Sequence, residues 1–161
     1  MQPRSHPLTS PTTRWGGAPG RPLVGRDTEL AELCQQLEPR AVRLLTLVGP
    51  PGVGRTELAR LAGWTLDAHF EDGACFVPLA AIHDAALVLP AIARALGVHE
   101  ADRQPSAEEL ANWLHGRELL LVLDNFEQLR SAARDVAWLL VECPRLAVLV
   151  TWSATITPVI F

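Results

Sequence analysis

The amino-acid sequence predicts an α/β domain, in which a parallel sheet lies between two layers of helices. Short apolar segments of strand length alternate along the chain with segments whose apolar residues repeat at helical spacing. A Gly- and Pro-rich loop at 49–54 separates the first of these strands from the helix that follows it. A later segment, 119–123, reads LLLVL and is apolar on both faces, which is typical of a strand buried in a parallel sheet. This alternation builds a three-layer sandwich.

The composition describes one ordinary folded domain. The chain has 161 residues, of which 48% are hydrophobic, so it can bury a core. Its 14 basic residues, all Arg, stand against 18 acidic ones, which argues against direct nucleic-acid binding. Cys34, Cys75 and Cys143 are odd in number and lack metal-ligand spacing, which favours free thiols in a reducing compartment. With no apolar run of membrane-spanning length, we expect a cytoplasmic protein without a membrane partner.

The first part of the chain changes character near residue 23. Residues 1–22 are rich in Pro, Ser, Thr and Gly, and we expect them to form a disordered leader. The folded domain is expected over 23–151. It opens with a helix that Asp27 or Thr28 caps and that Pro39 ends. The apolar face of this helix comprises Leu30, Leu33, Cys34 and Leu37.

The segment 43–59, RLLTLVGPPGVGRTELA, carries the main functional signal. A strand over 44–48, a Gly-rich loop and a helix from Thr56 to about His69 give the context of a phosphate-binding loop, and the residues nearly fit G-x-x-x-x-G-K-[ST]. Such a loop curls its backbone N–H groups around phosphates, and the helix start adds further N–H groups. Arg55 stands at the Lys position, and Thr56 supplies the hydroxyl that binds magnesium in such loops. Taken alone, the segment also fits an ordinary Gly-rich turn.

Three further elements are expected before the buried strand. The second strand covers 74–79, and Pro78 within it favours an edge position because a proline cannot donate to the ladder. A helix is expected over 90–97, with Pro at its start and Gly at its end. Another helix follows a capping box formed by Ser106 and Glu109.

Asp124 follows the buried strand directly, so its side chain is expected at the carboxyl edge where parallel sheets bind ligands. An acid at this position holds magnesium in phosphate-transferring enzymes, together with the hydroxyl of the loop. The alternative is that Asp124 only caps the next helix. That helix is expected to be long and to end at Pro144, and a fourth strand follows over 146–150.

Four motifs occur in order: Val24-Gly25-Arg26, GPPGVGRT at 49–56, LLLVLDNFEQL at 119–129 and CPRLAVLVT at 143–151. In order and spacing they resemble the nucleotide-binding domain of STAND ATPases, most closely the NB-ARC-like ATPase of large bacterial transcriptional regulators. The resemblance covers about 23–151. It implies a P-loop NTPase fold that binds ATP or ADP with magnesium, within a signalling or transcriptional regulator.

The resemblance also implies roles for the matching positions. Thr56 and Asp124 form the magnesium site, and Asp124 is the catalytic candidate. Glu127 is a second catalytic candidate because it could polarise water, but we favour its interpretation as an acid in the first turn of a helix. The implied nucleotide-binding residues are Val24, Gly25, Arg26, Gly49, Pro50, Gly52, Val53, Gly54, Arg55, Thr56 and Glu57.

Two departures from the family lower the expected activity. Arg55 replaces the Lys of the loop, and the arginine that senses the γ-phosphate after the fourth strand of the family has no match after Thr151. Composition changes over 152–161, which we interpret as a divergent tail in the place of the family's fifth strand. We therefore expect a sheet that is incomplete at its C-terminal end and can self-associate through its exposed edge.

The expected function is adenine-nucleotide binding with weak or no hydrolysis. The alternatives are an active ATPase, in which Arg55 serves as Lys does, and a remnant that no longer binds nucleotide. A small-molecule kinase is disfavoured because no segment resembles a substrate lid.

Overall fold

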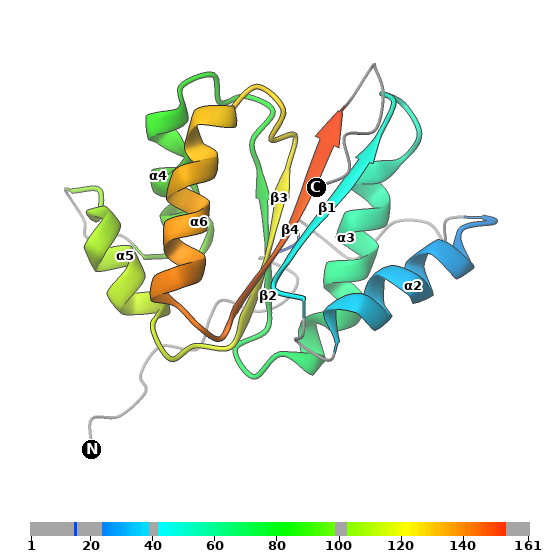
Figure 1. The fold of residues 1–161 in the computed structure, drawn as a ribbon, viewed down its shortest axis with the longest axis horizontal. Helices are drawn as coiled ribbons and strands as arrows, with labels where there is room; N and C mark the ends of the chain where they lie inside the picture. Colours follow the sequence, from blue (N-terminus) through cyan, green and yellow to red (C-terminus); the bar gives the residue numbers. More distant parts are fainter. Residues whose placement is uncertain (1–14, 16–23, 39–41, 99–102, 154–161) are drawn as a thin grey trace.

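The computed structural model describes residues 15, 24–38, 42–98 and 103–153 (Figure 1). In this part of the chain, four strands form one sheet in the order β1-β4-β3-β2, and every neighbouring pair is parallel. The strands are β1 (Leu44–Gly49), β2 (Ala74–Pro78), β3 (Leu119–Asp124) and β4 (Leu146–Ser153). The predicted α/β class with a parallel sheet is confirmed.

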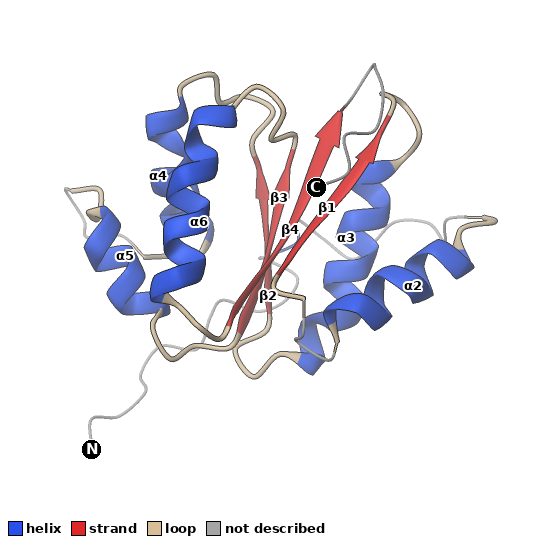
Figure 2. Ribbon diagram, viewed as in Figure 1, coloured by secondary structure: helices blue, strands red, loops and turns tan. Residues whose placement is uncertain are grey.

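Helices cover both faces of the sheet (Figure 2). One face carries α2 (Asp27–Leu37) and α3 (Arg55–Leu66), and the other carries α4 (Val88–Ala95), α5 (Ala107–Leu114) and α6 (Ala133–Glu142). Short 3-10 helices are η1 (Asp67–His69), η2 (Ala85–Leu87) and η3 (Arg130–Ala132). Among the described residues, no helix combines the length and the apolar character that a membrane crossing requires.

β3 is shared by the two hydrophobic cores. Its residues Leu119, Leu121 and Leu123 pack with α4, α5 and α6, whereas Leu120 and Val122 pack with α2 and α3. Successive side chains of a strand point to opposite faces, so a strand between two helical layers has to be apolar at every position. All six residues of β3 are buried, as the LLLVL run predicts.

β1 and β2 form the two edges of the described sheet. Pro78 ends β2, so its predicted edge position is confirmed. On β1, Leu45 and Leu47 pack toward α2 and α3. On the opposite face, Leu44 and Val48 leave 49% and 53% of their surface exposed. The strand before the Gly-rich loop therefore has two exposed apolar side chains on this face.

The chain after β3 differs from the prediction. A helix directly after Asp124 is excluded because Asn125 has a φ of 63°, in the left-handed region that a right-handed helix cannot contain. The helix α6 begins only at Ala133, after η3. β4 continues to Ser153, so Trp152 and Ser153 at the start of the predicted tail extend the strand beside β1.

Trp15 lies within the predicted leader and packs into the core. Only 3% of its surface is exposed, and its ring lies directly on Gly63 of α3, where an added Cβ would come within 2.1 Å of it. Its backbone carbonyl accepts a hydrogen bond from Arg60 at 2.7 Å. Residues 1–14, 16–22 and 154–161 lie outside the described residues, so the leader and tail boundaries stay predictions.

Candidate functional site

The Gly-rich loop connects the end of β1 to the start of α3. Gly52 and Gly54 have φ angles of +82° and +79°, a conformation that strains any residue with a Cβ. No other atom lies near the place of that Cβ, so backbone conformation alone requires glycine there. Leu58 donates the first helical hydrogen bond, at 3.0 Å to the Gly54 carbonyl. The preceding N–H groups have no acceptor within the helix, and N–H groups at such a helix start are suited to contact an anion.

Thr56 and Asp124 meet at the carboxyl edge of the sheet. The Thr56 hydroxyl lies 2.9 Å from Oδ1 and 3.1 Å from Oδ2 of Asp124. Only 4% of the Asp124 surface is exposed. Thr151, at the end of the apolar part of β4, donates a second hydroxyl hydrogen bond of 2.6 Å to Oδ1. The side chain of Asp124 thus accepts hydrogen bonds from two hydroxyl groups, which fix its orientation.

Thr151 is a site residue that sequence reasoning missed. Its hydroxyl also accepts a 2.9 Å hydrogen bond from the N–H of Asn125, and its carbonyl accepts one of 3.1 Å from Phe126. These bonds hold the turn in which Asn125 is left-handed, a conformation that Asn tolerates better than most residues. The available signal was a hydroxyl residue directly after the aliphatic run LAVLV.

The donor set fits magnesium. Thr56 and Asp124 offer hard oxygen ligands, which this cation prefers. Within the described ranges, no group of three or more His, Cys, Asp or Glu side chains could hold a metal ion. A nucleotide-associated magnesium does not need such a group, because phosphate oxygens and water complete its coordination.

Arg55 is bound to the end of β4. Its guanidinium group donates to the Trp152 carbonyl through one terminal nitrogen, and to the Ser153 hydroxyl at 2.7 Å through the other. The stem of Arg55 passes beside Gly49, where an added Cβ would lie 3.3 Å from Cδ of Arg55. Gly49 thus gives this side chain room to cross from the loop to β4.

Glu127 is also bound to β4. Its Oε2 accepts a 3.2 Å hydrogen bond from the N–H of Ser153. The Glu127 side chain therefore lies near the carboxyl end of β4, close to the candidate site, and it is hydrogen-bonded to the backbone there. Its first-turn interpretation is wrong as stated, since α6 begins only at Ala133.

The structure brings only some of the implied nucleotide-binding residues to one cavity. A cavity of about 520 Å³ is lined by α2, β1 and the loop, and Arg26 lines it together with Gly49, Pro50, Val53 and Arg55. Arg26 also pairs with Glu29 at 2.9 Å. Val24 is 95% exposed, and neither it nor Gly25 lines this cavity. Glu57, on the first turn of α3, is partly buried and lies 3.8 Å from Arg60.

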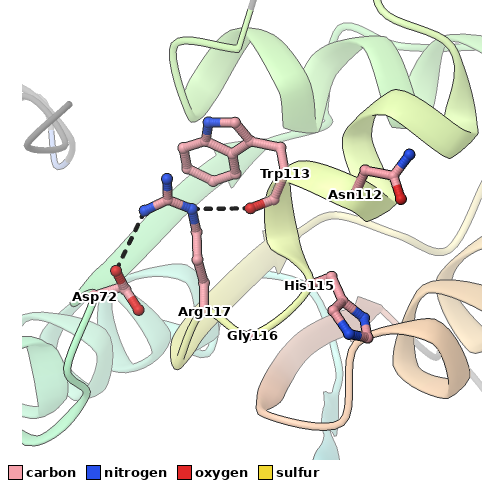
Figure 3. A pocket seen from close by; sticks show the side chains of 6 residues that line it. All are labelled: Asp72, Asn112, Trp113, His115, Gly116 and Arg117. Carbon is pink, nitrogen blue, oxygen red and sulfur yellow. Dashed lines mark hydrogen bonds and ion pairs between the residues drawn. The ribbon is translucent and has the colours of Figure 1, made fainter. Parts of the chain in front are cut away.

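A second cavity, of about 370 Å³, lies at the opposite edge, beside the amino end of β3 (Figure 3). Arg117 stacks on the Trp113 ring at 4.0 Å, donates to the Trp113 carbonyl at 2.9 Å and pairs with Asp72 at 3.3 Å. The His115 ring contacts the Glu142 carbonyl at 2.9 Å. These polar groups are engaged with one another, and ligands of parallel sheets bind at the carboxyl edge. We therefore place the functional site at the loop.

Comparison with known proteins places the chain among ATPase domains. A family model described as "AAA ATPase domain" matches residues 22–151. A protein named "Putative HTH-type transcriptional regulator" from Mycobacterium tuberculosis (strain ATCC 25618 / H37Rv) is 40% identical over 111 residues, which are 68% of this chain and 12% of that protein. An uncharacterized protein of the same strain is 34% identical over 135 residues, 83% of this chain and 34% of its own length.

Among solved structures, Cdc6p from Pyrobaculum aerophilum has a similar fold. The TM-score is 0.57 at 19% identity, and the match covers 92% of this chain and 44% of Cdc6p. At this identity the likeness concerns the fold alone, and it agrees with the P-loop NTPase fold that the Gly-rich loop predicts.

Proposed function

The chain belongs to the AAA ATPase domain family, and from this premise we propose that it binds ADP or ATP with magnesium and hydrolyses ATP weakly or not at all. AAA domains with the P-loop NTPase fold bind nucleotides, usually with magnesium. The observation that carries the proposal is the meeting of Thr56 and Asp124 at 2.9 Å beside a loop with two left-handed glycines. Bound magnesium supplies positive charge that neutralises the β- and γ-phosphates.

Each part of the site has a role in this proposal. The loop N–H groups and the start of α3 bind the phosphates. Thr56 and Asp124 hold the magnesium, and Thr151 keeps the Asp124 carboxylate oriented through its 2.6 Å hydrogen bond. Arg26 and the loop residues that share its cavity hold the rest of the nucleotide.

Weak hydrolysis is proposed because two charged side chains beside the loop, those of Arg55 and Glu127, are bound to β4. Arg55 donates to Trp152 and Ser153, and Glu127 accepts from the Ser153 N–H. A guanidinium group is also longer and more rigid than the ammonium group of lysine. Stabilisation of the transition state should suffer more than ground-state binding, and only the former raises the rate.

In the whole protein, we propose that this domain is the nucleotide switch of a cytoplasmic STAND-type or NB-ARC-like regulator. The support is the 40% identity to a protein named as a transcriptional regulator. Because the chain spans only 12% of that relative and 34% of the other, DNA binding belongs in this proposal to segments outside this chain. The net charge of −4 agrees with that division.

Calorimetry with ADP and ATP, each with and without magnesium, tests the proposal. We expect binding that magnesium strengthens, and we expect Thr56→Ala to remove that dependence. Thr65→Ala is the matched control, because Thr65 lies on the exposed side of the same helix and donates only to the Leu61 carbonyl. Absence of binding at millimolar nucleotide would favour the remnant alternative. Steady phosphate release that Asp124→Ala abolishes would establish the active ATPase instead.

A further inference from the structure

Ser153, on β4, binds two charged side chains of the site, those of Arg55 and Glu127. Its hydroxyl accepts from the Arg55 guanidinium at 2.7 Å, and its N–H donates to Glu127 at 3.2 Å. The neighbouring carbonyl group, that of Trp152, accepts a hydrogen bond from the other terminal nitrogen of Arg55. One short stretch of strand thus binds a residue of the phosphate loop and a residue from the turn after β3.

The stretch formed by Trp152 and Ser153 is held firmly in the sheet. It is paired with β1 in a parallel ladder, with Val48 opposite Trp152 and Gly49 opposite Ser153. The Trp152 ring packs against Phe126 with 6.4 Å between ring centroids, and the Arg130 guanidinium lies 5.3 Å above it. A guanidinium group bound to this stretch is therefore held by the sheet itself.

One atom of Arg55 is in an unfavourable environment in this position. Its Nε is buried and, within the part of the chain that the structure describes, has no hydrogen-bond partner, although it carries a donor hydrogen. A buried donor without an acceptor loses the hydrogen bonds that water would give it. Two hydrogen bonds thus hold the guanidinium group at β4, while the buried Nε disfavours this position. An anion at the loop could therefore compete with β4 for the guanidinium group.

We propose that Ser153 is a positioning residue that holds Arg55 at β4, in competition with the phosphates of a bound nucleotide. This inference rests on the proposed function. On phosphate binding, Arg55 leaves Trp152 and Ser153 and turns its donors to the phosphate oxygens. Ser153 therefore weakens nucleotide binding by stabilising the unbound position of Arg55.

The test is the full chain carrying Ser153→Ala, which removes the hydroxyl but keeps the N–H that binds Glu127. ADP with magnesium should bind about tenfold more tightly to this variant, as expected for loss of one hydrogen bond from a charged donor. Ser153→Thr keeps a hydroxyl and should bind as the parent does. Ser131→Ala, on an exposed serine of η3, is the control for a serine-to-alanine change. In an Arg55→Ala background, Ser153→Ala should change nothing.

A second measurement needs no nucleotide. In nitrogen-15 spectra of the arginine side chains, the Arg55 Nε–H signal is assigned by its loss in Arg55→Lys. The Nε hydrogen of Arg55 should exchange slowly with solvent in the parent, because the atom is buried. It should exchange faster in Ser153→Ala.

The outcomes separate the two proposals. If the parent binds nucleotide and Ser153→Ala leaves its affinity unchanged or lowers it, this result would overturn only the role of Ser153. Fast exchange of the Arg55 signal in the parent would do the same. Failure of every variant to bind nucleotide would overturn both this role and the proposed function.

Discussion

The hydroxyl of Thr56 lies 2.9 Å from Oδ1 of Asp124, although the two residues are 68 positions apart. The parallel sheet creates this relationship, because it brings the helix start after β1 and the end of β3 to one edge. The pair links the loop, which we propose binds phosphates, to the acid, which we propose holds magnesium.

The first prediction concerns the charge of Asp124. Asp124→Asn keeps the shape of the side chain and one oxygen that can accept from Thr56 or Thr151, but it removes the negative charge. The affinity for ADP with magnesium should fall about tenfold, whereas the affinity without magnesium should change much less. Calorimetry at several magnesium concentrations measures both. Equal losses with and without magnesium would indicate a structural role only.

The second prediction concerns Arg55→Lys. A lysine ammonium is compact and cannot bind Trp152 and Ser153 through a planar fork, so it is freer to contact phosphate. Nucleotide affinity should rise by a factor of about three, and phosphate release should stay near background because Glu127 remains bound to Ser153. Full turnover in this variant would show that Arg55 alone limits hydrolysis.

The third prediction concerns the contact between Trp15 and Gly63. Trp15→Ala should lower the free energy of unfolding by about 3 kcal/mol, because it empties a buried site between α3 and β2. Gly63→Ala should also destabilise the parent, since its Cβ would meet the Trp15 ring at 2.1 Å. Urea unfolding of both single variants and the double variant measures the coupling. If the two losses simply add, the ring does not occupy this site in solution.

The fourth prediction concerns the acid stability of α5. The predicted capping box is present, with hydrogen bonds of 2.7 Å from Ser106 N to Glu109 and 3.2 Å from Glu109 N to the Ser106 hydroxyl. The hydrogen bond from Arg103, followed by that from the Ser106 backbone, lowers the pKa of Glu109 from 4.5 to about 2. As the pH falls, the unfolded chain therefore binds the proton first.

Glu109 should thus contribute its full stabilisation above about pH 5 and lose it progressively as the pH falls toward 2. Urea unfolding of the parent and of Glu109→Gln between pH 6 and about pH 3 tests the sign. The stability difference between them should shrink as the pH falls. A difference that stays constant over this range would exclude the linkage.

The fifth prediction concerns the open face and edge of β1. We expect the chain to self-associate in solution, because Leu44 and Val48 are exposed on a strand at the edge of the described sheet. Leu44→Lys should lower the apparent mass measured by light scattering at high protein concentration. A parent that stays monomeric at every concentration would contradict this.

Local patterns in the sequence determined the elements and the loop. The period of the apolar residues predicts the strands and helices. The spacing of Gly49 and Gly54 predicts a phosphate-binding loop, and the place of Asp124 after a fully apolar strand predicts its position at the same edge of the sheet. Asn125 is one exception, since nothing local showed that it would adopt the left-handed conformation after which α6 begins only at Ala133.

Only the tertiary structure decided which side chains meet. The hydrogen bond between Thr151 and Asp124, the attachment of Arg55 to Ser153, and the packing of Trp15 on Gly63 each join residues distant in sequence. They depend on strand order, register and side-chain direction, which follow from packing of the whole core rather than from any one segment. For that reason the sequence could predict a phosphate-binding loop with an arginine in it, but only the fold shows that this arginine is bound to β4.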